Sequence, residues 1–75
     1  MKLLSLSEIE EVLNVHASRI PAVVEDGATL RRIKPYKHES DSNGCNWNVS
    51  IVSDVDYAVE ISALVMKLRI EYCAQ

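Results

Sequence analysis

The sequence has little of several residues that define special classes of protein. It contains no phenylalanine, two glycines, two prolines and two cysteines in 75 residues. So few glycines and prolines, beside 48% hydrophobic residues, exclude a low-complexity or disordered chain. Two cysteines are too few for a scaffold held together by disulfide bonds. A run of about 18 apolar residues, which a membrane-spanning helix needs, is also missing.

The opening of the chain and its length indicate a compartment and a domain count. Glu8 interrupts the apolar opening before a secretory signal could form, so we expect the protein to stay in a reducing cytoplasm. Residues 1–75 are expected to form a single domain, because the chain is too short for two. A chain this short buries only about 60% of its unfolded surface, so its core should be only marginally stable. We therefore expect its small core to be helped by a partner or by a second copy.

The charge is weakly negative overall but unevenly distributed. A formal net charge of -3 argues against a dedicated nucleic-acid binder, since such domains are usually strongly basic. Four cations nevertheless fall within the seven residues 31–37, which contain no acid. We call residues 31–37 the basic segment. An acidic stretch near the start, with Glu8, Glu10 and Glu11, is the other surface on which a partner could bind.

An N-terminal helix is predicted over about residues 6–19. With Ser5 as N-cap, Glu8 falls at the third helical position, which is the spacing of a capping box. Pro21 disfavours helical backbone at the residue before it, so the helix should end there. Apolar residues recur at steps of three and four and predict one buried stripe. The stripe comprises Leu6, Ile9, Leu13, His16 or Ala17, and Ile20.

Two strands are predicted over about residues 29–38 and 45–52, around the turn signal Asn43-Gly44. Both residues tolerate the positive φ that a two-residue hairpin turn requires. Beyond the turn, apolar and polar residues alternate, which is typical of a half-buried strand. The residues of the apolar face are Cys45, Trp47, Val49 and Ile51.

The register of the hairpin depends on the length of its turn. A two-residue turn places Tyr36 opposite Ile51 and His38 opposite Val49, which puts both on the apolar face. A slip by one residue would bring Lys37 onto that face and is disfavoured for that reason. The polar residues before the turn leave a longer loop open as an alternative.

A further short strand is predicted over residues 22–25. Asp26-Gly27 is a second turn signal and would pair this strand with residues 29–34. Together these stretches predict a small antiparallel sheet.

A C-terminal helix is predicted over about residues 55–73. The stretch has no glycine or proline and is rich in good helix formers, and Ser53 or Asp54 can cap it. Alternating apolar residues would also fit a strand, but ordinary strands have only about 3 to 10 residues. Most of the helix circumference is apolar, so it should pack against more than one neighbour. Arg69 lies on the apolar side, so it should either reach an edge or pair with an acid.

The sequence gives little support for a catalytic site or a metal site. Cys45 with His38 across the hairpin could act as a nucleophile and its base, but no third orienting group is evident, and a core-facing thiol is favoured. The spacing of His16, His38, Cys45 and Cys73 does not match zinc motifs. A Cys45–Cys73 disulfide is disfavoured in a reducing compartment. We therefore predict no enzymatic activity, no metal and no cofactor.

The basic segment is the candidate binding site. Its clustered cations and single aromatic suit an acidic protein surface, or the phosphates and a stacked base of a nucleic acid. An exposed strand protected from aggregation by its charges is the alternative. Trp47 should anchor the core, and any exposed part of it would join the binding site. The candidate binding residues are Arg31, Arg32, Lys34, Tyr36, Lys37 and Trp47.

A short motif adds a resemblance to a family. Gly44-Cys45-Asn46-Trp47, followed by a C-terminal helix ending in Arg69-x-x-Tyr72, resembles a group of short phage and prophage proteins of no known activity. The resemblance covers residues 43–72 and assigns no catalytic residue. It implies a bacterial or phage origin. Many small phage proteins act by binding and disabling host machinery, including restriction and CRISPR complexes.

We therefore expect an α+β domain in the order helix, β-hairpin or small antiparallel sheet, helix, with the C-terminal helix packed on the sheet. The expected function is non-enzymatic binding of a bacterial host protein or complex, as a phage-type inhibitor or regulator. The alternative is a nucleic-acid-associated module that uses the basic segment. A homodimer is expected to be possible, because the C-terminal helix is apolar on nearly all sides.

Overall fold

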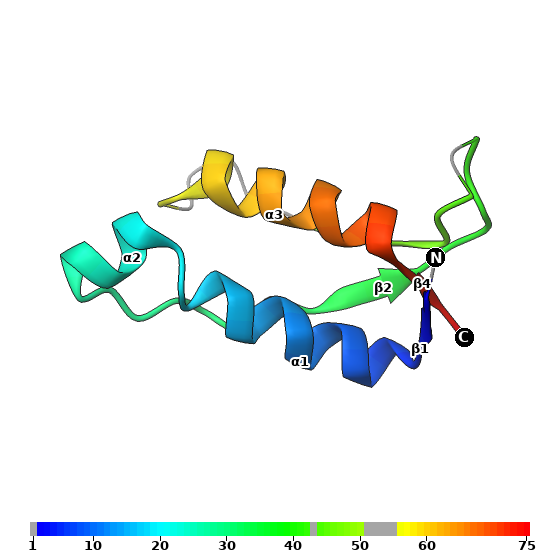
Figure 1. Cartoon of the computed structure of the whole chain (residues 1–75), viewed down its shortest axis with the longest axis horizontal. Helices are drawn as coiled ribbons and strands as arrows, with labels where there is room; N and C mark the ends of the chain where they lie inside the picture. The colour runs from blue at the N-terminus through cyan, green and yellow to red at the C-terminus, as the bar shows by residue number, and fades with distance from the viewer. Residues whose placement is uncertain (1, 43, 51–55) are drawn as a thin grey trace.

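The protein is an α+β domain, as the sequence predicts. The computed structural model describes residues 2–42, 44–50 and 56–75. In chain order the elements are β1 (Lys2–Leu4), α1 (Leu6–Ala17), α2 (Pro21–Asp26), β2 (Pro35–Lys37), β3 (Trp47–Val49), α3 (Ala58–Glu71) and β4 (Tyr72–Ala74). Two long helices lie side by side, with strand β2 between them, the short helix α2 at one end and the chain termini together at the other (Figure 1).

The predicted N-terminal helix is confirmed as α1, with its capping box. The Glu8 backbone N–H donates to Ser5 Oγ at 3.1 Å, and the Ser5 backbone N–H donates to Glu8 Oε1 at 3.0 Å. The hydrogen bond from the Ser5 backbone holds the pKa of Glu8 below its ordinary value. Ile9, Leu13 and Ala17 are buried along one face, so the predicted stripe is the one that meets the core.

The predicted strand over residues 22–25 is wrong, because this stretch is helix α2. Pro21 occupies the first turn, where its fixed φ suits a helix and its missing N–H costs nothing. Gly27 ends the helix in the left-handed conformation, at φ 61°, and its N–H bonds back to the carbonyls of Val23 and Val24. Asp26-Gly27 is therefore a helix stop, a role that glycine fills as readily as a hairpin turn.

The predicted hairpin is present, but its strands are shorter and its register differs. β2 and β3 are antiparallel, with Pro35 opposite Val49 and Lys37 opposite Trp47. The predicted pairings of His38 with Val49 and of Tyr36 with Ile51 are both wrong, because Val49 lies opposite Pro35 and Tyr36 lies opposite Asn48. The observed register places Lys37, and not His38, on the side of Trp47.

A loop longer than two residues causes this difference. The Asp41 backbone N–H donates to the Cys45 carbonyl at 2.9 Å, and the Gly44 N–H donates to the Asp41 carbonyl at 3.0 Å. The Asp41 carboxylate also accepts the Cys45 N–H at 3.0 Å. Asp41 therefore organises this end of the hairpin, as aspartate commonly does in turns. Asn43, half of the predicted turn, lies outside the described residues.

Lys37 can face the Trp47 side because it lies at the edge of the sheet. Its ammonium donates to the backbone oxygen of Gln75 at 2.7 Å, so the charged end of the side chain lies outside the apolar core.

The rest of the predicted first strand, residues 29–34, forms no ladder and is held by a side chain. Asn14 of α1 donates from Nδ2 to the Ile33 carbonyl and accepts the Ile33 N–H at Oδ1, both at 2.8 Å. The amide pairs with this backbone as a neighbouring strand would. Asn14 Nδ2 also donates to the Glu10 carbonyl at 2.7 Å.

The predicted C-terminal helix is confirmed as α3, although it begins at Ala58 and not near residue 55. The predicted caps, Ser53 and Asp54, lie outside the described residues. Tyr57 precedes the helix in the left-handed conformation, at φ 67°. Its hydroxyl donates to Asp26 Oδ2 at 2.5 Å and so ties the start of α3 to the end of α2.

The last two residues of the predicted helix, Tyr72 and Cys73, instead belong to strand β4, which the sequence pattern does not predict. β4 pairs in parallel with β1, with Lys2 opposite Tyr72 and Leu4 opposite Ala74. Each strand has three residues, which is too short to show an alternating pattern. The pair brings the two ends of the described chain together (Figure 1).

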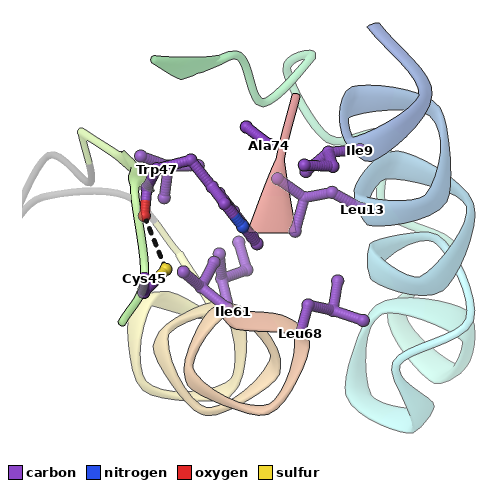
Figure 2. Packing of buried hydrophobic residues seen from close by; sticks show 9 residues of the cluster. Ile9, Leu13, Cys45, Trp47, Ile61, Leu68 and Ala74 are labelled. Atoms are coloured by element: carbon purple, nitrogen blue, oxygen red, sulfur yellow. Dashed lines mark hydrogen bonds between the residues drawn. The ribbon is translucent and has the colours of Figure 1, made fainter. Parts of the chain in front are cut away.

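The core lies where α1, α3 and the inner face of the hairpin meet. α3 covers the predicted apolar face of β3, and the Trp47 indole reaches toward Leu13 and Ala74 (Figure 2). The largest side chains with less than 2% exposure are Trp47, Ile9, Leu13 and Leu68. Among the described helices, none is both long and apolar enough to cross a membrane.

Candidate functional site

The basic segment does not present its charges together. Arg32 points to α1, where Nε lies 2.6 Å from Glu10 Oε2 and Nη2 lies 3.1 Å from Glu11 Oε2. The hydrogen bond to Glu10, followed by that to Glu11, raises the pKa of the Arg32 guanidinium. Arg32 therefore holds the segment against α1, together with the Asn14 contact, and its charge is largely matched within the chain.

The other predicted members of the segment stay at the surface. Arg31 and Lys34 are exposed and form no salt bridge with any residue in the described part of the chain. Tyr36 is 46% exposed, and its ring lies 6.1 Å from that of His38 on the same side of β2. Lys37 is exposed, but its ammonium is bonded to the backbone oxygen of Gln75. We call Arg31, Lys34 and Tyr36 the basic patch.

Trp47 does not contribute to this surface. Its side chain is completely buried, and its indole N–H donates to the Tyr72 carbonyl at 3.0 Å. The expected role as core anchor is confirmed. The predicted role in binding is withdrawn, because no part of the side chain reaches solvent.

Cys45 is part of a polar cluster that joins the hairpin to α3. Cys45 is 3% exposed, and its thiol donates to the Trp47 carbonyl at 3.3 Å and accepts from Arg69 Nε at 3.2 Å (Figure 2 shows the first of these bonds). Arg69 Nε also donates to the Trp47 carbonyl at 2.8 Å, and Nη2 pairs with Asp41 Oδ2 at 2.6 Å.

Arg69 is therefore paired with an acid, which was one of the two predicted outcomes. One guanidinium bonds a strand carbonyl, a thiol and a turn carboxylate, and it holds β3 and the Asp41 turn against the last turn of α3. The sequence shows an arginine on an apolar face, but not which acid it meets, because Asp41 is 28 residues away.

His38, the possible base in the disfavoured catalytic interpretation, makes hydrogen bonds elsewhere. Its Nδ1 is 2.5 Å from the Glu39 carbonyl, and its backbone N–H donates to the Asn46 carbonyl at 2.8 Å. The polar groups that bond the Cys45 sulfur within the described residues are a carbonyl and a guanidinium. Neither of these groups is a general base for the thiol.

Asn46 attaches the other side of the hairpin to β4. Its Nδ2 donates to the Ala74 carbonyl at 2.7 Å, and its Oδ1 accepts the Ala74 N–H at 2.8 Å. The Cys73 thiol donates to the same Oδ1 at 3.2 Å. Both cysteines are free thiols. The alternating pattern predicts that Asn46 lies on the polar face of the hairpin, but it does not predict that β4 packs beside this face.

A surface groove of about 350 Å³ lies between α1, α2 and residues 28–32. Among the polar side chains in its wall, Asn14 is already bonded to Ile33 and Arg32 to the α1 acids. We assign it no ligand. Across the described ranges, no three His, Cys, Asp or Glu side chains are grouped closely enough to hold a metal ion.

No protein-family model, curated protein or solved structure matches this chain.

Proposed function

We propose that this chain is a non-enzymatic protein-binding module that recognises an acidic surface on a bacterial host protein through the basic patch. The phage-type role of inhibitor or regulator, acting on a defence complex such as a restriction or CRISPR assembly, depends on the resemblance of the Gly44-Cys45-Asn46-Trp47 motif. The contact chemistry depends on the geometry described above.

The observation that carries the proposal is an unmatched positive patch on an acidic chain. The whole chain has a net charge of -3, yet Arg31 and Lys34 are exposed and form no salt bridge with another described residue. Tyr36 adds a half-exposed aromatic side chain of the kind that anchors protein interfaces. Such a patch favours encounter with an acidic surface and raises the association rate.

The proposal differs from the sequence-based prediction in its residues. Arg32 and Trp47 leave the contact surface, because one is matched by the α1 acids and the other is buried. Lys37 lies beside the patch, with its ammonium held by Gln75. Arg31 and Lys34 flank Ile33, whose backbone is hydrogen-bonded to Asn14 of α1. The backbone that carries these two cations is therefore already ordered before a partner binds.

Capture from bacterial lysate with paired variants tests the proposal. Reversing the charge of the patch, in Arg31→Glu/Lys34→Glu, should abolish recovery of a defined protein complex. The matched control, Lys2→Glu/Arg19→Glu, changes the net charge equally at exposed positions outside the patch and should retain the complex. Equal recovery by the two double variants would exclude the patch as the contact surface.

Nucleic-acid binding by the same patch is the competing outcome. Cations near an exposed aromatic can hold phosphates and stack a base, although the net negative charge opposes it. Binding of DNA or RNA that falls steeply with salt, and is lost in the patch variant but not in the control, would replace the protein-binding proposal.

A further inference from the structure

Arg32 is the one arginine of the basic segment whose charge is taken up within the chain. Arg31 precedes it directly and Lys34 follows two residues later, and both are exposed members of the basic patch. The Arg32 guanidinium is instead bonded to α1, through Nε to Glu10 and through Nη2 to Glu11. The chain therefore supplies the acids that keep this arginine out of the patch.

The contact between Arg32 and the two acids is open to solvent. The side chain of Arg32 is 50% exposed, that of Glu11 68% and that of Glu10 26%. Ion pairs at such exposure contribute little to stability, because water screens them and two long side chains must be held in one geometry. Glu8, the third acid of this stretch, instead bonds the Ser5 N–H at the start of α1. Carboxylates from another molecule can therefore compete for Arg32 with Glu10 and Glu11 alone.

The backbone beside Arg32 is held by a separate contact. Asn14 bonds both the N–H and the carbonyl of Ile33, the residue that follows Arg32. These two bonds involve neither the guanidinium nor the acids of α1. Release of Arg32 from Glu10 and Glu11 therefore leaves the segment attached to α1, and only a surface side chain has to change rotamer, which is a fast motion.

We infer that Glu10 and Glu11 form an autoinhibitory contact with Arg32, and that an acidic partner recruits Arg32 to the basic patch by exchanging its own carboxylates for theirs. The inference rests on the proposed binding of an acidic surface by the basic patch. The planar guanidinium can bind a carboxylate through two parallel hydrogen bonds, so a released Arg32 adds a third cation with directional donors to the contact.

Titration with a hexaglutamate peptide at low ionic strength, followed by NMR, tests the inference. Glu10→Gln/Glu11→Gln should bind this probe about threefold to tenfold more tightly than the wild type, because two exposed ion pairs no longer compete for Arg32. The matched control, Glu25→Gln/Glu60→Gln, removes the same charge at exposed positions on α2 and α3 and should gain less than about twofold. Equal gains in the two variants would overturn the inference.

A second pair of variants separates recruitment of Arg32 from a general change in charge. Adding Arg32→Gln to Glu10→Gln/Glu11→Gln should return the affinity for hexaglutamate to about that of the wild type. Adding Arg19→Gln instead removes one charge at an exposed position after the end of α1 and should preserve most of the gain. If the two additions lower the affinity equally, Arg32 does not reach the probe and the inference is wrong.

The patch variant Arg31→Glu/Lys34→Glu distinguishes failure of this inference from failure of the proposed function. Hexaglutamate binding that is present in the wild type and lost in the patch variant supports the basic patch as the site for acidic groups. If binding is then no tighter in Glu10→Gln/Glu11→Gln than in its control, only the autoinhibitory contact is excluded. If the patch variant binds the probe as well as the wild type does, or no variant binds it, the proposed function and the inference both fail.

Discussion

Asn14 allows a quantitative test of how the basic segment is held. Its amide makes three hydrogen bonds, and Asn14→Asp keeps the shape of the side chain while replacing the donor with an oxygen. The bonds from Nδ2 to the Ile33 carbonyl, at 2.8 Å, and to the Glu10 carbonyl, at 2.7 Å, are lost. The bond that Oδ1 accepts from the Ile33 N–H is retained.

The magnitude follows from the two lost bonds. Each intramolecular hydrogen bond contributes about 0.5–1.5 kcal/mol, so the variant should lose about 1–3 kcal/mol of unfolding free energy. The total stability of a domain of this length is on the order of 4–11 kcal/mol, so the loss is substantial. A loss of about 2 kcal/mol corresponds to a decrease in Tm of about 8–16 °C.

Thermal and urea unfolding followed by circular dichroism measure this change, and Asn48→Asp is the matched control. Asn48 accepts the Val49 N–H through Oδ1 at 2.8 Å, a bond that a carboxylate can also accept. The control should therefore lose much less stability. At acid pH the new carboxyl at position 14 regains a proton to donate, so its deficit should shrink. Equal stability of the two variants at neutral pH would refute the proposed role of Asn14.

Three further predictions concern single side chains. Because the pKa of Glu8 is lowered in the folded state, its carboxylate stabilises the fold above pH 4.5, and this stability is lost as the pH falls through the folded pKa. Glu8→Gln should therefore flatten the dependence of Tm on pH below pH 4.5. The hydrogen bond to Asp26 raises the pKa of Tyr57 to about 12, so stability from this contact is present below pH 10 and lost as pH rises through about 12. In an absorbance titration, Tyr57→Phe should remove the tyrosine that ionises last, and an unchanged final phase would contradict the assignment. Arg69→Leu should lower the free energy of unfolding, measured in urea, by about 2–3 kcal/mol, because it removes the bonds to Trp47 and Asp41. Arg69→Lys should lower it less, because lysine keeps the charge beside Asp41 although it lacks the planar donor fork. Equal losses in the two variants would show that the charge contributes nothing.

The parts of the fold that depend on neighbouring residues were predictable. The capping box at Ser5 and Glu8, the buried stripe of α1 and the alternation at Cys45, Trp47 and Val49 are all confirmed, because each expresses a spacing of a few residues. The error over α2 has the same local origin. Asp26-Gly27 suits a hairpin turn and a helix end alike, and six residues are too few for the period to decide.

The candidate site was predicted only in part, because charges find partners far away in the chain. Arg31, Lys34 and Tyr36 remain exposed as expected. Arg32 does not act with them, since Glu10 lies 22 residues away in sequence and 2.6 Å away in space. The sequence shows that α3 is apolar on most sides, but not which side packs against the core.

By itself, the sequence determined the fold class, the two long helices, the inward face of β3 and the negative balance of charge. These follow from composition and from periods of two and 3.6 residues, which the backbone enforces locally. The tertiary structure alone decided the hairpin register, the pairing of β1 with β4, the acid that binds Arg69 and the side of α3 that faces outward. Each of these joins residues distant in the chain, and their contact depends on how the whole core closes, which no local spacing records.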